Sequence, residues 1–265
     1  MKIGFIGSGK MAEALIRSFL DSGTSVKDEI FASDKSGERL RSLSKELGIN
    51  TAANNAEVVE NSGAIFLSVK PQDMETVLKE ISDVSKGKLF ISIAAGITLS
   101  FIENYLKGAK VVRVMPNMNI MVGEGISCYS PGKKCGKDEE KSVANLLTVV
   151  GKAIKVDEKK LDAVTALSGS GPAFYAFVMD AFAKAGIEQG LNSEEAYLLA
   201  EQTALGTAKL LMDRKIGTKE LIDAVASKGG TTEAGLRAMD QAALRREISR
   251  AVAAAKKRAG ELSNG

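Results

Sequence analysis

The stretch Ile3–Ala12, which reads IGFIGSGKMA, decides the fold class of this chain. It is a short apolar strand that runs into Gly-x-Gly-x-x-Ala and then into an amphipathic helix pattern. Gly7 permits a tight turn, Gly9 lets the backbone approach a pyrophosphate closely, and Ala12 keeps the helix near the sheet. Such a motif is weak in isolation because glycine-rich turns are common. Its place after a strand and before a helix predicts a dinucleotide-binding site, with the phosphates at the helix N-terminus.

Outward from this turn, the first 157 residues alternate short apolar runs with amphipathic stretches. Five apolar runs predict buried strands, over Lys2–Ile6, Ile30–Ser33, Ala64–Val69, Leu89–Ile93 and Val111–Met115. Four stretches between them predict helices, over Met11–Leu20, Glu38–Leu47, Met74–Val84 and Leu99–Leu106. This alternation predicts an α/β domain with a doubly wound, Rossmann-type parallel sheet and right-handed crossovers.

From residue 158 the strand patterns stop, and long helix patterns rich in Ala and Leu follow. The predicted helices cover Pro172–Glu188, Ser193–Met212, Lys219–Ala226 and Thr232–Leu262. Ser193 precedes two glutamates and is predicted to cap the second helix. We therefore predict a dinucleotide-binding domain over residues 1–157 and an all-helical domain over residues 158–265. These helices are too long and apolar for an isolated small bundle, so we expect a partner subunit to cover one face.

The composition excludes several kinds of site. The chain has 265 residues and no histidine, which excludes Ser-His-Asp and Cys-His hydrolysis and histidine-ligated zinc. Cys128 and Cys135 cannot complete a four-ligand zinc site, so no metal is predicted, and both are expected as reduced thiols. The net charge of +3 is too small to indicate nucleic-acid binding.

Membrane insertion is not predicted either. The longest run without a charge, Ala163–Met179, has 17 residues, and a membrane span needs about 20 apolar residues. Met1 leads directly into the first strand pattern, without the apolar segment of a signal peptide. We therefore expect a cytoplasmic protein with no membrane partner.

The second predicted strand ends in Ser33-Asp34-Lys35, where the adenosine ribose of a dinucleotide binds. An acid there favours the free ribose hydroxyls of NAD, whereas Ser33 and Lys35, with Arg39 beyond them, suit the 2′-phosphate of NADP. Asp34 lies 25 residues past Gly9, slightly beyond the usual position of the acid, so we expect it to point away. The balance favours NADPH, with NADH as the alternative cofactor.

The third predicted strand ends in Val69-Lys70-Pro71, a charged and stiff turn. In a doubly wound sheet, ligands bind beyond the carboxyl ends of the strands, near the point where strand order reverses. Lys70 is therefore predicted to face the ribose or the nicotinamide of the cofactor. The alternative is a lysine that only points into solvent from a loop.

Six segments together define a resemblance that covers essentially the whole chain. They are Gly4–Gly9, Val69–Gln72, Ala94–Gly96, Arg113–Asn117, Asp162–Ala173 and Gly229–Leu236. The first is generic to dinucleotide folds, and the last two together are specific. With them, the chain resembles the pyrroline-5-carboxylate reductases.

This resemblance implies reduction of the cyclic imine 1-pyrroline-5-carboxylate to L-proline by NAD(P)H, the last step of proline biosynthesis. It also implies a Rossmann domain followed by a helical domain that binds substrate and forms homodimers, which sometimes assemble into larger rings. For the cofactor it implies Gly7, Ser8, Gly9, Lys10, Met11, Ser33, Asp34, Lys35, Asn55, Val69, Lys70, Pro71 and Ala95. For the substrate it implies Glu158, Ser227, Gly230, Thr231 and Thr232.

Thr232 and Glu158 are the candidate catalytic residues. Hydride transfer to a C=N bond needs an electrophilic carbon, so the protonated iminium is the better acceptor. The backbone amides of Gly229–Thr232 at a helix start suit a carboxylate, and Thr232 can add a hydroxyl donor toward the carboxylate or the imine nitrogen. Glu158 can stabilise the iminium by its charge. The structural alternative for Thr232 is a plain helix N-cap.

Two departures from the family pattern affect these expectations. The chain has Met118-Asn119 where members often have Thr-Pro, which leaves the path of that loop open. It has Lys228 where members usually have proline, which puts a positive charge beside the expected carboxylate site, either to bind the anion or to face solvent. Lys215 stands where some members have another proline-lining acid, so that role is not assigned here.

Two rival functions are weighed against this one. A 3-hydroxyacid-dehydrogenase-like oxidoreductase shares the plan but uses a catalytic lysine at the start of the long helix. Here Ser168–Ala173 has no lysine after it until Lys184. The second rival is a non-catalytic NADP-binding sensor that regulates a partner. Activity on related cyclic imines also stays open.

Overall fold

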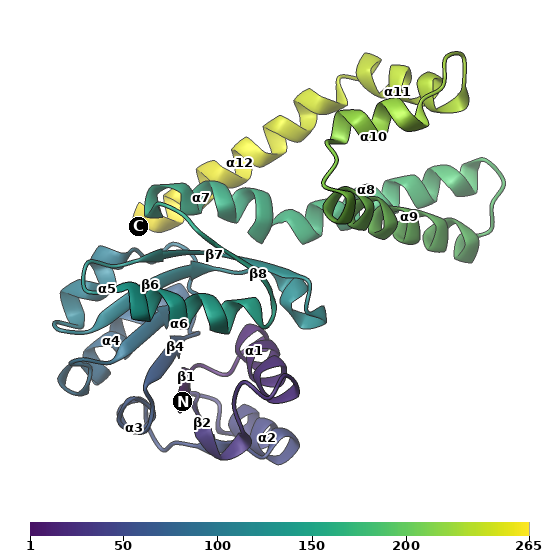
Figure 1. The fold of residues 1–265 in the computed structure, drawn as a ribbon. Coiled ribbons are helices and arrows are strands. Elements are labelled where there is room, and N and C mark those ends of the chain that lie inside the picture. Colours follow the sequence, from purple (N-terminus) through teal and green to yellow (C-terminus); the bar gives the residue numbers. More distant parts are fainter. Residues whose placement is uncertain (265) are drawn as a thin grey trace. The chain divides into compact units, whose positions relative to one another are not determined.

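The computed structural model describes residues 1–264 and divides into two compact units. Unit 1 contains Met1–Ser170 together with the C-terminal end of the chain from Ala255. Unit 2 contains Gly171–Ala254. Figure 1 shows the elements of both units, coloured along the sequence.

Unit 1 is built on one sheet with the strand order β3-β2-β1-β4-β5-β6-β7-β8. The strands are β1 (Ile3–Ile6), β2 (Ile30–Ser33), β3 (Asn50–Thr51), β4 (Ala64–Leu67), β5 (Leu89–Ser92), β6 (Lys110–Met115), β7 (Gly125–Pro131) and β8 (Gly151–Lys155). All pairs are parallel except β6 with β7, which is antiparallel. The strand order reverses between β1 and β4, which confirms the predicted doubly wound sheet. The antiparallel strand β7 is absent from the sequence-based prediction.

Helices cover both faces of this sheet (Figure 1). They are α1 (Lys10–Asp21), α2 (Gly37–Leu47), α3 (Asn55–Asn61), α4 (Met74–Ile81), α5 (Leu99–Tyr105), α6 (Lys137–Thr148) and α7 (Leu161–Val164). One buried cluster joins the sheet to α1, α2 and α6, and a second joins it to α3, α4 and α5. Phe5 and Phe66 stack in the first cluster with ring centroids 4.9 Å apart, whereas the next residue, Leu67, belongs to the second. The central strands β1, β4, β5 and β6 are thus buried on both faces, which explains their continuous apolar runs.

Unit 2 is helical, and the last helix leads back into unit 1. Its helices are α8 (Gly171–Glu188), α9 (Ser193–Arg214), α10 (Thr218–Val225), α11 (Thr231–Gln241) and the first part of α12 (Leu244–Asn264). The predicted single helix over Thr232–Leu262 is wrong. The helix is interrupted between α11 and α12, where Ala243 adopts a φ of 52°. The predicted cap is also wrong by one residue. Asn192 caps α9 and accepts a hydrogen bond from the backbone N–H of Glu195.

Helices α8 and α9 pack on one another within unit 2. Ala183 and Ala196 are buried there, and Tyr197 donates a hydrogen bond to Asp180 at 2.7 Å. Their other faces leave large apolar side chains in solvent, with Tyr175 70% and Phe177 75% exposed. This is the pattern expected where a partner subunit covers a helix face.

No helix in residues 1–264 combines the length and the apolar character needed to span a membrane.

Candidate active site

The glycine-rich turn between β1 and α1 is shaped to hold an anion. Gly7 has a φ of +90°, and a Cβ atom there would lie 2.8 Å from the carbonyl oxygen of Ser68, just after β4. Gly9 is the N-cap of α1 and has no side chain to satisfy the first N–H groups of the helix. Apart from Gly9 itself and its two chain neighbours, no atom of the described residues lies within 4 Å of a Cβ placed on Gly9. The free space and the N–H groups of α1 together fit a pyrophosphate.

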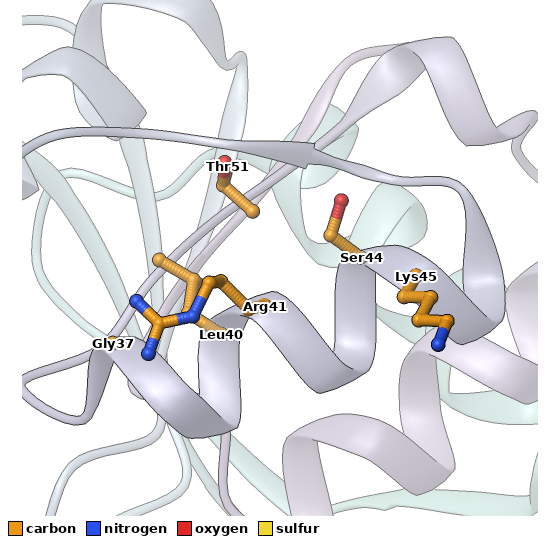
Figure 2. A pocket seen from close by; sticks show the side chains of 6 residues that line it. All are labelled: Gly37, Leu40, Arg41, Ser44, Lys45 and Thr51. Carbon is orange, nitrogen blue, oxygen red and sulfur yellow. The ribbon is translucent and has the colours of Figure 1, made fainter.

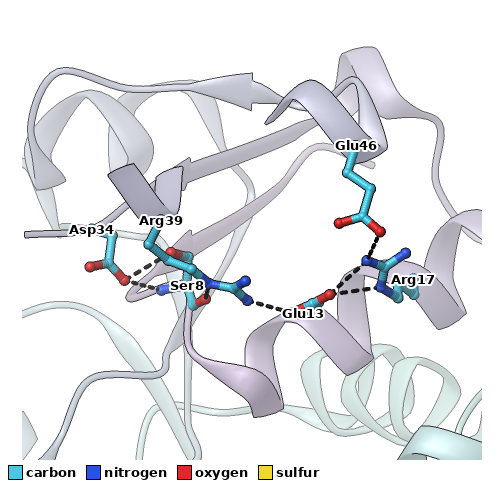
Figure 3. Close-up of polar contacts among 6 residues, drawn as sticks. All are labelled: Ser8, Glu13, Arg17, Asp34, Arg39 and Glu46. Atoms are coloured by element: carbon cyan, nitrogen blue, oxygen red, sulfur yellow. Dashed lines mark hydrogen bonds and ion pairs between the residues drawn. The ribbon is translucent and has the colours of Figure 1, made fainter. Parts of the chain in front are cut away.

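Asp34 holds this turn in place (Figure 3). Its Oδ2 atom accepts hydrogen bonds from the backbone N–H of Ser8 at 2.6 Å and from the Ser8 hydroxyl at 2.8 Å. Its Oδ1 atom accepts from the N–H of Ser36 at 2.8 Å. Burial raises the pKa of Asp34, but the hydrogen bonds from Ser36 and Ser8 outweigh it, so the pKa lies below its usual value. The carboxylate is therefore engaged with the turn.

Arg39 supports the same turn from α2. Its Nε donates to the carbonyl oxygen of Ser8 at 2.8 Å, and its guanidinium pairs with Glu13 on α1. Glu13 also pairs with Arg17, which reaches Glu46 at 2.6 Å (Figure 3). Hydrogen bonds from Arg39 and then Arg17 lower the pKa of Glu13. Arg39, considered for a 2′-phosphate, is thus part of an ion-pair chain that braces α1 against α2.

Two contacts connect the remaining predicted residues at the end of β2. The Ser33 hydroxyl donates to Oδ1 of Asn55, the first residue of α3, at 2.7 Å. Lys35 is 77% exposed and pairs with Asp73 at 2.9 Å, in the short 3₁₀ helix that follows β4. The loops after β2 and β4 are therefore linked by an ion pair whose lysine is accessible to a ligand.

The other predicted cofactor residues follow β4 and β5. Val69, Lys70 and Pro71 come directly after β4, and Ala95 lies in the loop between β5 and α5. Lys70 is exposed and precedes the 3₁₀ helix. All the predicted cofactor residues thus lie at the carboxyl edge of β1 to β5, around the point where strand order reverses. Their contact with a cofactor remains a prediction.

The predicted substrate turn lies in unit 2, at the start of α11. Gly230 is the N-cap, so Thr231 and Thr232 are the first two residues of the helix, and the alternative of Thr232 as N-cap is wrong. A Cβ atom on Gly230 would meet the Ser227 hydroxyl at 2.5 Å. Lys228 is exposed on the same turn. The structure brings Ser227 and Gly230–Thr232 together, with N–H groups that no N-cap side chain satisfies.

Glu158, in unit 1, is held by two donors. Its Oε1 atom accepts from the backbone N–H of Leu99 at 2.7 Å and from Arg113 at 3.2 Å. Arg113 is missing from the sequence-based site. The signal that could have found it is a single arginine inside the apolar run Val111–Met115, because a buried strand rarely carries an unpaired charge.

A surface pocket of about 400 Å³ runs along α2 and β3 and does not coincide with this edge of the sheet. Figure 2 shows the residues that line it, which are Gly37, Leu40, Arg41, Ser44, Lys45 and Thr51. None of them is among the predicted cofactor or substrate residues, so the pocket is not the candidate site.

Comparisons with known proteins agree with both halves of the chain. Residues 2–96 match the family model described as NADP oxidoreductase coenzyme F420-dependent, and residues 158–262 match pyrroline-5-carboxylate reductase dimerisation. The pyrroline-5-carboxylate reductase of Methanosarcina acetivorans is 40% identical over 98% of this chain and 97% of its own. The pyrroline-5-carboxylate reductase of Arabidopsis thaliana is 40% identical over 99% of this chain and 95% of its own.

Solved structures agree as well. A pyrroline-5-carboxylate reductase from Coxiella burnetii superposes with a TM-score of 0.93 at 33% identity, covering 99% of this chain and 98% of the other. The Plasmodium falciparum enzyme with NADP bound has a TM-score of 0.90 at 28% identity, covering 99% and 98%.

The sheet, the glycine-rich turn and the helical unit define an NAD(P)H-dependent oxidoreductase with a dimerisation domain. The chain belongs to the pyrroline-5-carboxylate reductase family. A 3-hydroxyacid-dehydrogenase-like enzyme and a non-catalytic sensor are not favoured by these relatives.

Proposed function

We propose that this protein reduces 1-pyrroline-5-carboxylate to L-proline, with NADPH as the preferred reductant, as the last step of proline biosynthesis. Family membership over the whole chain supports the reaction. The structural observation that carries it is a pair of open helix starts, at Gly9 before α1 and at Gly230 before α11. Each suits one of the two anions that this reaction brings to the enzyme, a pyrophosphate and a carboxylate.

The residues of unit 1 bind and orient the cofactor. The N–H groups of Lys10 and Met11 hold the pyrophosphate at the start of α1. When bound, NADPH supplies the hydride that reduces the C=N bond. Because Asp34 is already engaged by Ser8, it is a poor acceptor for a ribose hydroxyl, and the accessible ammonium of Lys35 favours a 2′-phosphate. These two observations support the preference for NADPH.

The residues that would hold the nicotinamide half come from the loops after β4 and β5. In a doubly wound sheet ligands bind beyond the carboxyl ends of the strands where strand order reverses, so these loops would meet the second half of the dinucleotide. We assign Val69, Lys70, Pro71 and Ala95 to this half of the cofactor.

The residues of unit 2 hold the substrate carboxylate. The N–H groups of Thr231 and Thr232 at the start of α11, with the hydroxyl of Ser227 beside Gly230, provide donors for it. Thr232 can also donate its hydroxyl toward the ring nitrogen and so stabilise charge in the transition state. We propose that the substrate-binding and dimerisation part begins at residue 158, where the match to the dimerisation model begins.

Glu158 has a smaller role in this scheme than its charge alone suggests. Pairing with Arg113 neutralises part of the charge that would stabilise an iminium. Both described contacts fall on Oε1, so Oε2 is the atom that would accept an N–H from the product ring. We therefore place Thr232 first among the candidate catalytic residues.

The enzyme works as an oligomer in this proposal. The dimerisation model covers α8 to α12, and the exposed aromatic side chains of α8 supply an apolar surface for the contact. We propose a homodimer as the basic unit, and light scattering of the purified protein distinguishes it from a larger ring.

Substrate-dependent oxidation of NADPH tests the function. Purified protein should consume NADPH when 1-pyrroline-5-carboxylate is added, and it should not form NADPH when NADP⁺ and a 3-hydroxyacid are supplied. The six-membered cyclic imine measures the tolerance for ring size. NADPH binding without turnover of the five-membered imine would contradict the proposal and favour a sensor.

A further inference from the structure

A buried arginine in β6 links two segments that meet at the loop between β5 and α5. The Arg113 side chain is 6% exposed. One of its guanidinium nitrogens lies 3.2 Å from Oε1 of Glu158, and the other lies 3.9 Å from Oδ1 of Asp162. A buried charge is costly unless opposite charges compensate it, so Arg113 fixes where these two carboxylates lie.

The first carboxylate reaches one end of the loop. Glu158 accepts the backbone N–H of Leu99 at 2.7 Å. Leu99 is the first residue of α5, and Thr98 is the N-cap, whose hydroxyl accepts the N–H of Phe101. Glu158 and Thr98 thus satisfy N–H groups that the first turn of α5 leaves free, and they fix the point where the loop ends.

The second carboxylate reaches the middle of the loop through the end of the chain. Asp162 accepts a hydrogen bond from the Ser263 hydroxyl at 3.1 Å. The last turn of α12 then lies against the loop, because a Cβ on Gly96 would stand 2.7 Å from the carbonyl oxygen of Leu262. Figure 1 shows this end of the chain beside α7, which carries Asp162.

We propose that Arg113 is a positioning residue for the loop 93–98 and, through Ala95, for the nicotinamide half of NADP(H). The proposal rests on the cofactor role of Ala95 in the proposed function. Arg113 acts through Glu158 on the end of the loop and through Asp162 and the α12 end on its middle. The adenosine half, at the ends of β1 and β2, is outside the reach of this network.

Binding of two ligands distinguishes a positioning role of Arg113 from a general effect on stability. NADP⁺ spans the whole edge of the sheet, whereas 2′,5′-ADP contains only the adenosine half. Arg113→Met should raise the Kd of NADP⁺ about 5- to 10-fold and leave the Kd of 2′,5′-ADP within about twofold. Hydrogen exchange of a peptide covering residues 93–99 should accelerate. Arg250→Met, which removes an exposed arginine that pairs with Glu247, is the control and should change neither Kd.

Gentler variants cover the case in which Arg113→Met does not fold. Arg113→Lys keeps the charge but has one nitrogen for two carboxylates, so it should give an intermediate rise in the Kd of NADP⁺ alone. Ser263→Ala cuts only the second path and should give a smaller rise, again without effect on 2′,5′-ADP. Equal changes for both ligands, or no change in a folded Arg113 variant, would overturn the proposal.

Failure of the proposed function has a different appearance. If the proposed function were wrong, the wild-type protein would not oxidise NADPH in the presence of 1-pyrroline-5-carboxylate. The binding measurements above do not use this imine, so their outcome is independent of that result. If the wild type bound no NADP⁺, the exchange rate of residues 93–99 would still decide whether Arg113 holds the loop.

Discussion

Asp34 accepts both hydrogen bonds that Ser8 can donate, from the backbone N–H at 2.6 Å and from the hydroxyl at 2.8 Å, through the single atom Oδ2. The end of β2 and the glycine-rich turn after β1 are therefore one rigid edge. The carboxylate that would mark an NAD site is used here to shape the phosphate turn.

Asp34→Ala should weaken NADPH and NADH alike. The hydrogen bonds lost are to a charged acceptor, worth about 1.5–3 kcal/mol each, and they support the turn that both cofactors use. We expect both Kd values to rise by about tenfold or more in titrations that follow the fluorescence of the reduced cofactor, while the exposed-acid control Asp21→Ala changes neither. A loss of affinity for NADH alone would show that Asp34 binds the ribose.

The same carboxylate should make stability depend on pH in acid. Its pKa is lower in the folded state than the ordinary 3.8, so it stabilises the fold above that value. This contribution is lost as the pH falls through the lower, folded-state pKa. The Tm difference between wild type and Asp34→Asn should stay constant down to about pH 5 and shrink below about pH 4. A difference that grew in acid would contradict this.

Lys35→Ala should discriminate between the two cofactors. Loss of an ammonium group near a 2′-phosphate should raise the KM for NADPH by about tenfold, which corresponds to about 1.4 kcal/mol, and should leave the KM for NADH nearly unchanged. Asp73→Asn releases Lys35 from its ion pair and is expected to lower the KM for NADPH slightly. Steady-state kinetics with both cofactors test this, and equal effects of Lys35→Ala on both would refute the assignment.

Thr232→Ala should lower kcat/KM if the Thr232 hydroxyl acts in the transition state. The expected loss of transition-state stabilisation is about 2–4 kcal/mol. Thr218→Ala is the control, because Thr218 also lies in the first turn of a helix with a glycine N-cap. Kinetics with saturating NADPH and varied imine measure the effect. Equal kcat/KM for the two variants would make the Thr232 hydroxyl a bystander.

Phe177→Lys should dissociate the dimer. Phe177 is three-quarters exposed in the isolated chain, so a symmetric dimer contact would bury one Phe177 side chain from each subunit. A lysine at this position would then bury a charge, which costs several kcal/mol if the charge is left unpaired. Light scattering should report half the wild-type mass. Val26→Lys, on an exposed apolar residue of unit 1, is the control. An unchanged mass for Phe177→Lys would place the contact elsewhere.

The sequence-based strand assignment finds β1, β2, β4, β5 and β6 and misses β3, β7 and β8. β1, β2, β4, β5 and β6 carry continuous apolar runs because helices cover both sides of the sheet. β8 is missed because it lies at the edge and includes exposed Lys152 and Lys155. The interruption before α12 could not be predicted, because it contains no glycine or proline and the residue with positive φ is Ala243.

The candidate site shows the same division. Residues that act by backbone geometry, such as Gly7 and Gly9, can be read from local spacing. The partners of charged side chains cannot, because Arg113 and Glu158 are 45 residues apart and Asp162 and Ser263 are 101 apart. Only the folded sheet brings such pairs together.

Unit 1 takes its final segment from beyond unit 2, which makes unit 2 an insertion between Ser170 and Ala255. A fragment that stopped at Ser170 would lack the turn that touches Gly96 and Asp162. An independent nucleotide-binding half is therefore better made by joining residues 255–265 to residue 170 through a linker than by truncation.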